Sequence, residues 1–468
     1  MATKQELALL PSVDSVLCTP EISVLGETCD PVFLTELVRT AVGETRKSIL
    51  VGNGEHATRA DLLAGVVAVV LEKFKEMVSP RYKKVINATG IVLHTNMGRA
   101  PLPQQAIDQI AEVAGGYSNL ELDLETGSRG SRTDLIEDML CRLTSAEAAA
   151  VVNNNAAAVL ISLNTLSNGK DALVSRGELV EIGGSFRIPD IMSRSGAKMV
   201  EVGTTNRTHL EDFETAITEQ TGAMLAVHPS NYRVLGFTAG VSLEKLVTLG
   251  ASRGVPVIHD LGGGILVDLK RFGLPHEPVV SESVIAGADV VTFSGDKVLG
   301  GPQAGVIVGK REAIEAIRKN PLMRALRCGK LTYAALEATL KLFLNPEALQ
   351  ESHPTLRMFT ESTDVLQERG EAIVGALADI SGQDVTIQVG SSIAQAGSGT
   401  LPLEEISSVA LVVQSKSPSV NELATRLRRN DPPIMGYLQE DRLFLDLRTV
   451  DEKDLAALEA GLRKSISA

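Results

Sequence analysis

A run of apolar residues that ends in a lysine and several glycines constrains this chain more than any other feature. Residues 290–293 (Val-Val-Thr-Phe) are β-branched or aromatic, which is typical of a strand buried on both faces. They lead into Ser294-Gly-Asp-Lys297, and three glycines follow by position 305. A lysine just past a buried strand is shielded from water, which lowers the pKa of its amine. Such an amine can form a Schiff base with an aldehyde. On this stretch alone, a turn with a solvated lysine is the alternative.

A second predicted strand, residues 255–260, ends in a carboxylate. Asp260 is followed by Leu261 and three glycines. The usual aldehyde partner of a buried lysine is pyridoxal phosphate (PLP), which needs an acid against its pyridine nitrogen because the protonated ring is the electron sink. Asp260 at one strand end and Lys297 at a later one fit this requirement. Asp260 alone would suit a turn or a helix N-cap equally well, so it is the combination that favours PLP.

Three further features of the sequence suit the phosphate group and the ring of PLP. A predicted strand is followed by Asn153, Asn154 and Asn155 and then by a helix start. Amides at a helix N-terminus form a phosphate site, although simple capping of the helix is the alternative. Ser294 can donate its hydroxyl to the same phosphate. His228 follows another predicted strand and can stack on the cofactor or bond to it, although a lone histidine is more often structural.

Arginines point to a second anion site. Arg324 and Arg327 are three residues apart, so on a helix they share a face. This spacing suits bidentate capture of a phosphate-like anion, and it also suits an exposed, salt-bridged surface. Arg99 lies in a polar, glycine-containing stretch (85–103) that we interpret as a binding loop. Arg129 and Arg132 can bind anions or pair with a neighbouring subunit.

Strands and helices alternate from Tyr82 onward, which predicts a parallel sheet. The pattern divides the chain into four parts. We expect an N-terminal helical domain at 1–57, a helical linker at 58–81, a large α/β domain at 82–335 and a smaller C-terminal α/β domain at 336–468.

Composition limits the possible partners. The net charge of −13 over 468 residues leaves no broad basic surface, so any contact with nucleic acid must be local, and we expect no DNA partner. Residues 1–80 carry seven Lys and Arg against eleven Asp and Glu. The absence of Trp and the 3% aromatic content argue against a stacking platform for single-stranded nucleic acid.

Cysteine usage and hydropathy bear on the compartment. The four cysteines are scattered without a CxxC pair, which suggests a reducing compartment and no metal site. The N-terminus lacks a long apolar segment, and the apolar run at 62–71 is too short to cross a bilayer. We therefore expect a cytoplasmic protein without membrane contact.

Several long motifs resemble the bacterial L-seryl-tRNA(Sec) selenium transferases, the selenocysteine synthases. They stand at 85–103, 117–132, 153–160, 175–192, 230–237, 292–305 and 326–340, and the opening LPSVDSVL adds to them. The resemblance covers nearly the whole chain. It implies a fold-type I PLP-dependent transferase, with an aspartate aminotransferase-like large domain, a smaller C-terminal α/β domain and an N-terminal helical domain.

The resemblance also implies roles for particular residues. Lys297 would carry PLP, with Asp296 beside it at the active site. Arg99, Arg324 and Arg327 would bind the phosphate-like part of selenophosphate. The N-terminal domain would recognise the tRNA, and the chain would form a homodecamer, a pentamer of dimers with active sites at dimer interfaces. This chain departs from the family pattern at one place. The family commonly has Val-Asp-Lys where this chain has Cys328-Gly-Lys330.

The implied reaction converts L-seryl-tRNA(Sec) to L-selenocysteinyl-tRNA(Sec). PLP-dependent β-elimination would give aminoacrylyl-tRNA, to which selenium from selenophosphate adds. A related PLP lyase that acts on a small amino acid or amino sugar phosphate is the nearer alternative, and the N-terminal helical unit argues against it. A non-catalytic tRNA-binding protein is the other, and the presence of Lys297, Asp260 and the asparagines argues against that.

Overall fold

The computed structural model describes residues 7–51, 58–182, 186–232, 234–382, 384–401 and 404–467. It divides into two compact units, Met1–Lys84 and Val85–Ala468. Each unit has its own buried apolar cluster. In the part of the chain so described, no helix combines the length and the hydropathy that crossing a bilayer requires.

The N-terminal unit is helical, as the sequence predicts. Its helices are α2 (Val13–Leu17), α3 (Pro20–Gly26), α4 (Pro31–Leu50) and α5 (Arg59–Val78). Thr58 caps α5 in a reciprocal box with Asp61. The helix that the sequence suggested as a linker, α5, packs against α4, and apolar residues of both helices share one core. Residues 1–6 and 52–57 of the predicted N-terminal domain lie outside the described residues.

A seven-stranded sheet forms the centre of the second unit. Its strands, in spatial order, are β2 (Ala148–Val152), β10 (Gly305–Gly309), β9 (Val290–Ser294), β8 (Val257–Gly262), β7 (Thr221–Val227), β3 (Asp171–Ser175) and β6 (Lys198–Val202). The sheet is mixed where we predicted a parallel one, because β10 runs antiparallel to both β2 and β9. The reason is the short connection at 295–304, which is too short for a parallel crossover.

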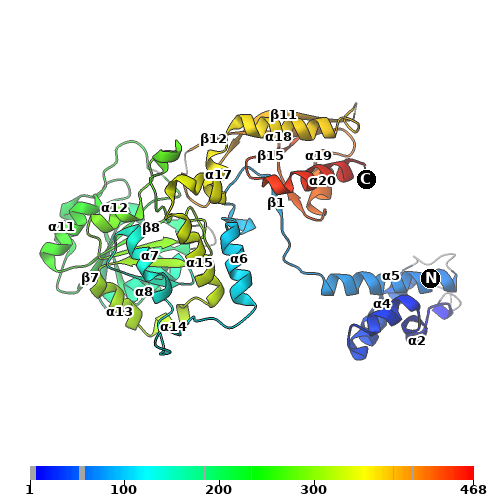
Figure 1. The fold of residues 1–468 in the computed structure, drawn as a ribbon, viewed down its shortest axis with the longest axis horizontal. Helices are drawn as coiled ribbons and strands as arrows, with labels where there is room; N and C mark the ends of the chain where they lie inside the picture. Colours follow the sequence, from blue (N-terminus) through cyan, green and yellow to red (C-terminus); the bar gives the residue numbers. More distant parts are fainter. Residues whose placement is uncertain are drawn as a thin grey trace. The chain divides into compact units, whose positions relative to one another are not determined.

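Helices cover both faces of this sheet (Figure 1). Alternate residues of the strands point to opposite faces, and each set joins a separate apolar cluster. One cluster includes residues of α7 (Asp134–Thr144) and α15 (Lys330–Leu342), and the other those of α8 (Asn155–Ser167), α9 (Ile188–Arg194) and α13 (Arg311–Lys319). The remaining elements are α6 (Gln104–Ala114), α10 (Leu210–Ala216), α11 (Leu243–Arg253), α12 (Val280–Ile285), α14 (Leu322–Leu326), α16 (Leu349–Ser352), α17 (Pro354–Thr360), β4 (Glu181–Ile182) and β5 (Phe186–Arg187).

The C-terminal part carries a second sheet, which is antiparallel. Its order is β11 (Val385–Ala394), β12 (Ile406–Ser415), β15 (Arg442–Asp446) and β14 (Tyr437–Gln439). Helices α18 (Thr363–Ala376), α19 (Val420–Arg428) and α20 (Leu455–Ser467) share one apolar core with alternate residues of β11, β12 and β15. The other residues of these strands form the opposite face of the sheet.

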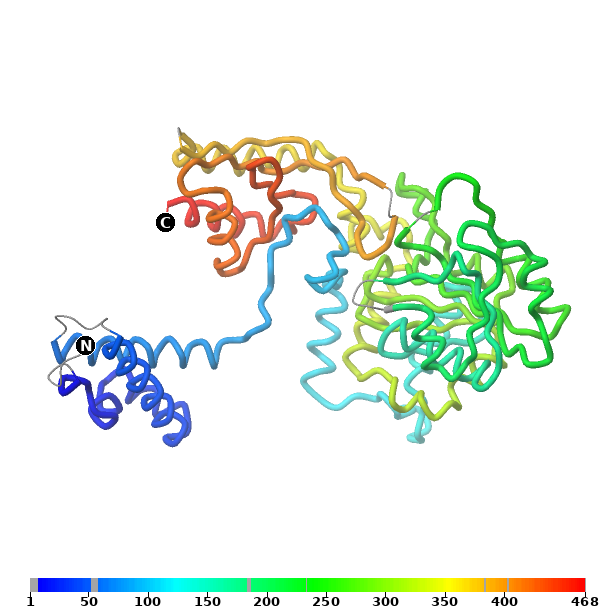
Figure 2. Tube along the Cα trace, turned by 180° about the vertical axis from the view of Figure 1, so that it is seen from behind, coloured from blue at the N-terminus to red at the C-terminus, as the bar shows by residue number. Residues whose placement is uncertain are grey.

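The start of the second unit is joined to its C-terminal part. Strand β1 (Ile86–Asn87) pairs in parallel with β13 (Ile434–Met435), and Ile86 and Ala88 are buried in the same apolar cluster as α18 and α20. Figure 2 shows the chain passing beside the C-terminal elements before it enters α6. The loop that follows β1 therefore links the two sheets.

Candidate active site

Polar residues gather at the carboxyl ends of the parallel strands β2, β7, β8 and β9. Ligands of open α/β sheets bind at this edge, outside the strand ends. Asn153 follows β2, His228 follows β7, and Ser294 is the last residue of β9. Asp260 lies in β8, opposite Thr292 of β9. The site that we predicted from separate strand ends is thus one region of the molecule.

Asp260 is buried and held by two donors. The Asn155 side-chain amide donates to its Oδ1 at 2.8 Å, and the Thr292 hydroxyl donates to the same oxygen at 3.0 Å. Burial raises the pKa of Asp260, while these bonds and the charges of Lys297 and His228 oppose the rise. These two bonds restrict rotation of the Asp260 carboxylate, which can therefore stay directed at a single protonated group.

Lys297 lies in the buried turn between β9 and β10 and is 3% exposed. Its Nζ is close to Gly262, where an added Cβ would stand 3.8 Å from the amine. Burial lowers the pKa of Lys297, and the nearby carboxylate of Asp260 partly offsets this effect. The amine is therefore shielded from water, as the sequence predicts.

The three asparagines have three different environments, where the sequence suggested a single cradle. Asn153 is exposed, and its backbone N–H donates to the carbonyl of Leu326 at 2.9 Å. The Asn154 side chain caps α8 by accepting from the N–H of Ala157 at 2.9 Å. Asn155 is the asparagine that bonds Asp260. The N-terminus of α8 still presents backbone N–H groups and the positive end of the helix dipole to an anion.

His228 and Ser294 lie beside this group. The backbone N–H of His228 donates to the carbonyl of Asp260 at 2.9 Å, and its Nε2 lies 3.2 Å from Oε2 of Glu277. Ser294 is 6% exposed and stands three residues before Lys297. Among the described residues, no group of three or more His, Cys, Asp and Glu side chains could hold a metal ion.

Arg99 and Asp296 form an ion pair next to Lys297. Arg99 Nη1 lies 2.7 Å from Asp296 Oδ2, and both residues line a cavity of 490 Å³. Arg99 has a φ of 63°, a left-handed conformation that is uncommon for a residue with a side chain. Such strain is often found where a side chain must be aimed at a ligand.

Arg324 and Arg327 do not share a helix face. Helix α14 ends at Leu326, so Arg324 is helical whereas Arg327 is the extended residue that follows. Arg327 pairs with Glu121 at 3.1 Å. The same carboxylate accepts from Arg129 and Arg132, and these bonds lower the pKa of Glu121. Arg99 and Arg327 therefore hold different carboxylates in this structure.

These residues fit PLP. A buried amine and a buried carboxylate lie at one sheet edge, with a helix N-terminus beside them. The Oδ1 atom of Asn155 is buried with no hydrogen-bond partner among the described residues, so the site has an unfilled acceptor. At Gly305 an added Cβ would stand 2.0 Å from the carbonyl oxygen of Asn154, so only glycine lets β10 approach the start of α8.

The sequence did not reveal several partners. Thr292, Glu121 and Glu277 bond predicted site residues, yet each is distant in sequence from the residue that it holds. Glu178, after β3, is half-buried: the N–H of Val227 donates to its Oε2 at 2.8 Å, and the loss of water around its carboxyl raises its pKa to about 7. A charged residue at a strand end is the only signal that sequence offers for it.

Comparison with known proteins gives a consistent result. Residues 85–451 match the family model described as SelA, L-seryl-tRNA selenium transferase. The chain is 45% identical over 460 residues to the L-seryl-tRNA(Sec) selenium transferase of Alkaliphilus metalliredigens, with 98% of each chain covered. It is 46% identical over 464 residues to the enzyme of that name from Nitratidesulfovibrio vulgaris, again with 98% of each chain covered.

A solved structure supports the fold alone. D-Glucosaminate-6-phosphate ammonia-lyase superimposes with a TM-score of 0.57 at 20% identity, over 84% of this chain and 98% of that one. The predicted fold class, a fold-type I large domain with a smaller C-terminal α/β domain, is confirmed.

Glu178 predicts a pH dependence of stability. Between about pH 4.5 and 7 the folded chain binds more protons at this carboxyl than the unfolded chain, so the free energy of unfolding falls as pH rises through this range. Glu178→Gln stays neutral and can still accept from Val227. We expect it to raise the free energy of unfolding by about 3 kcal/mol at pH 8 and by less than ~1 kcal/mol at pH 5.

Urea unfolding at the two pH values measures this difference. Glu181→Gln, three residues along, is the matched control, because Glu181 is exposed and its ion pair with the exposed Arg187 should contribute less than about 1 kcal/mol. If Glu178→Gln and the unaltered chain have the same pH dependence, Glu178 is already ionised at low pH and the assignment is wrong.

Proposed function

This chain belongs to the L-seryl-tRNA selenium transferase family, and we propose that it converts the serine of seryl-tRNA(Sec) into selenocysteine, with PLP as cofactor and selenophosphate as selenium donor. Two observations together carry the proposal. Relatives of that name match at 43–46% identity over nearly the full chain, and this chain buries Lys297 and Asp260 at the edge where a ligand of such a sheet binds.

Bound PLP supplies an electron sink that permits loss of the serine α-proton and β-hydroxyl and then addition of a selenium nucleophile. Lys297 provides the amine that holds the cofactor and, once released, a base for the α-proton. Its lowered pKa increases the neutral, proton-accepting fraction near neutral pH. Asp260 would stabilise a protonated ring nitrogen, and Asn155 and Thr292 keep its carboxylate in place.

Water is kept from the base by the turn that carries it. Residues 290–301 are buried without interruption, so the backbone on either side of Lys297 is packed. Leu299 lies fully buried in the apolar cluster beneath the turn. A dry site strengthens the interaction between the amine and the carboxylate of Asp260.

We assign the selenium donor to Arg99, Arg324 and Arg327. Guanidinium groups bind phosphate-like anions through paired hydrogen bonds. Arg99 already holds one oxyanion, the carboxylate of Asp296, beside Lys297. This contact supports the proposal that an anionic donor takes up a similar position, with Asp296 as its neighbour.

A lyase acting on a small amino acid or amino sugar phosphate shares the fold but is the weaker proposal. Its support is the likeness to D-glucosaminate-6-phosphate ammonia-lyase at 20% identity. The full-length relatives favour the tRNA-linked reaction.

We further propose that the N-terminal helical unit recognises the tRNA, that the chain assembles as a homodecamer built from five dimers, and that it acts in the cytoplasm. Residues 81–84 (Arg-Tyr-Lys-Lys) add three positive charges to the acidic N-terminal unit. These charges support a local contact with RNA phosphates.

The first test supplies the PLP-loaded protein with seryl-tRNA(Sec) and selenophosphate, and with free serine in a parallel reaction. We expect selenocysteinyl-tRNA from the first reaction only. Lys297→Ala should lower its rate roughly 10²–10⁴-fold, whereas Lys310→Ala, an exposed lysine paired with Asp289, should not. Turnover of free serine or an amino sugar phosphate, with seryl-tRNA ignored, would support the lyase instead.

A second test addresses the donor site. Arg327→Gln removes a charged hydrogen-bond donor, and we expect the KM for selenophosphate to rise roughly 10- to 100-fold with tRNA affinity unchanged. Arg129→Gln is the control, because Arg129 shares the partner Glu121 but its side chain is 76% exposed. Equal effects of the two substitutions on KM would remove Arg327 from the donor site.

A further inference from the structure

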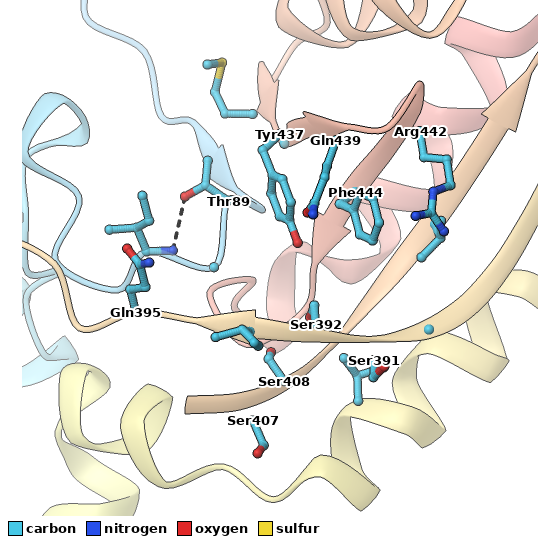
Figure 3. Close-up of a pocket in the computed structure, with 18 of the residues that line it drawn as sticks. Thr89, Ser391, Ser392, Gln395, Ser407, Ser408, Tyr437, Gln439, Arg442 and Phe444 are labelled. Carbon is cyan, nitrogen blue, oxygen red and sulfur yellow. Dashed lines mark hydrogen bonds between the residues drawn. The ribbon is translucent and has the colours of Figure 1, made fainter. Parts of the chain in front are cut away.

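A cavity lies on the C-terminal sheet, outside the site discussed above. It has a volume of 1230 Å³ and is lined by residues of β11, β12, β14 and β15 and of the loop after β1 (Figure 3). No role assigned so far uses it.

The strand pairing explains what forms its wall. One row across the sheet consists of Gln388, Val412, Phe444 and Tyr437, each paired with the next. The rings of Tyr437 and Phe444 stack with centroids 5.1 Å apart and planes 11° from parallel. The guanidinium of Arg442 lies 5.4 Å from the centre of the Phe444 ring. Phe444 is buried under this stack at 7% exposed, so the half-buried Tyr437 and Arg442 form the accessible part of the wall, with amide groups at its rim.

The loop that begins the second unit closes one end of the cavity. At Gly90, an added Cβ would stand 3.0 Å from Cγ and Oδ2 of Asp446. The Asp446 carboxylate is fully buried and accepts from the hydroxyls of Ser392 and Ser408 at 2.6 and 2.8 Å. Ser392 and Ser408 line the cavity and Asp446 does not, so the closed end presents hydroxyl groups to a ligand.

The same loop leads to the catalytic lysine. Thr89, Ile91 and His94 line the large cavity, and Arg99, five residues after His94, lines the smaller one with Asp296. The backbone N–H of Ala100 also donates to the carbonyl of Asp296 at 3.4 Å. The loop that lines the large cavity therefore also contacts the turn that carries Lys297.

The lining chemistry is specific. Among the described residues that line the cavity, only two carry a charged side chain of the Asp, Glu, Lys or Arg type. These are Arg442 and Glu440, which pair with each other at 2.5 Å. The remaining polar groups are neutral amides and hydroxyls, including those of Gln388, Gln395 and Gln439. His94 adds a buried Nδ1 with no hydrogen-bond partner in the described part of the chain. Neutral donors and acceptors beside aromatic faces suit nucleobases and riboses better than oxyanions.

We propose that this cavity binds the unpaired 3′-terminal nucleotides of the aminoacyl-tRNA, so that the amino acid on the last ribose reaches Lys297. The proposal rests on the proposed function, since it requires a tRNA-linked substrate. Proteins recognise single-stranded RNA by stacking bases on aromatic or Arg side chains and by bonding their edges. The volume also exceeds the 300–1,000 Å³ typical of small-molecule pockets, as several nucleotides require.

The test compares two RNAs and two sets of variants. Binding of the PLP-loaded chain is measured for full-length seryl-tRNA(Sec) and for the same tRNA trimmed of its unpaired 3′ end. Gln388→Ala/Gln439→Ala removes two exposed amides from the cavity rim. Gln414→Ala is the matched control. Gln414 is an exposed glutamine of β12, two residues after Val412 and therefore on the same face of the sheet, but it does not line the cavity.

We expect the double variant to weaken binding of the full-length tRNA roughly tenfold and to leave binding of the trimmed tRNA unchanged. The salt dependence of binding should not change, because no phosphate contact is removed. The control should bind both RNAs as the unaltered chain does.

Two results would overturn the proposal. Equal weakening for both RNAs would show that the amides act away from the 3′ end, and no weakening would show that the cavity is unused. If the unaltered chain makes selenocysteinyl-tRNA in either case, the proposed function stands while the cavity assignment falls. If it binds neither RNA, both fall.

Discussion

The burial of Lys297 opposite Asp260 is the constraint on which the rest of the active site depends. Removing an amine and a carboxylate from water is costly unless each is paired and hydrogen-bonded. For Asp260 the chain meets this requirement with Asn155 at the start of α8 and Thr292 in the neighbouring strand. The mixed sheet contributes as well, because the antiparallel β10 makes the connection that carries Lys297 short and buried. The same burial that lowers the pKa of the amine also prepares it for chemistry at neutral pH.

The loop after β1 contacts both the C-terminal sheet and the region around Lys297. It begins as a strand paired with β13, passes against Asp446 at Gly90 and ends at Arg99 beside Asp296. This one stretch of backbone lines the proposed nucleotide cavity, supplies Arg99 and contacts the turn that carries Lys297. A substrate with a nucleic-acid end and a reactive amino acid would contact this stretch along its length.

Local sequence was sufficient where a residue's surroundings lie close to it along the chain. The apolar run before Lys297 predicted its burial, and the run before Asp260 predicted a carboxylate at the same sheet edge. It was insufficient where partners are distant: Glu121 reaches Arg327, and the cavity joins Thr89 to Tyr437. The three asparagines looked like one cradle because sequence cannot show where each side chain points. The low aromatic content likewise did not show that Tyr437 and Phe444 would stack across paired strands.

The central claim is that Lys297 carries the cofactor, and chemical trapping tests it most directly. The protein is loaded with PLP, reduced with borohydride to fix the cofactor on the amine that holds it, digested and mapped by mass spectrometry. We predict a pyridoxyl label on Lys297 and loss of that label in Lys297→Ala. A label on another lysine in the unaltered chain, or no retained PLP at all, would contradict the claim.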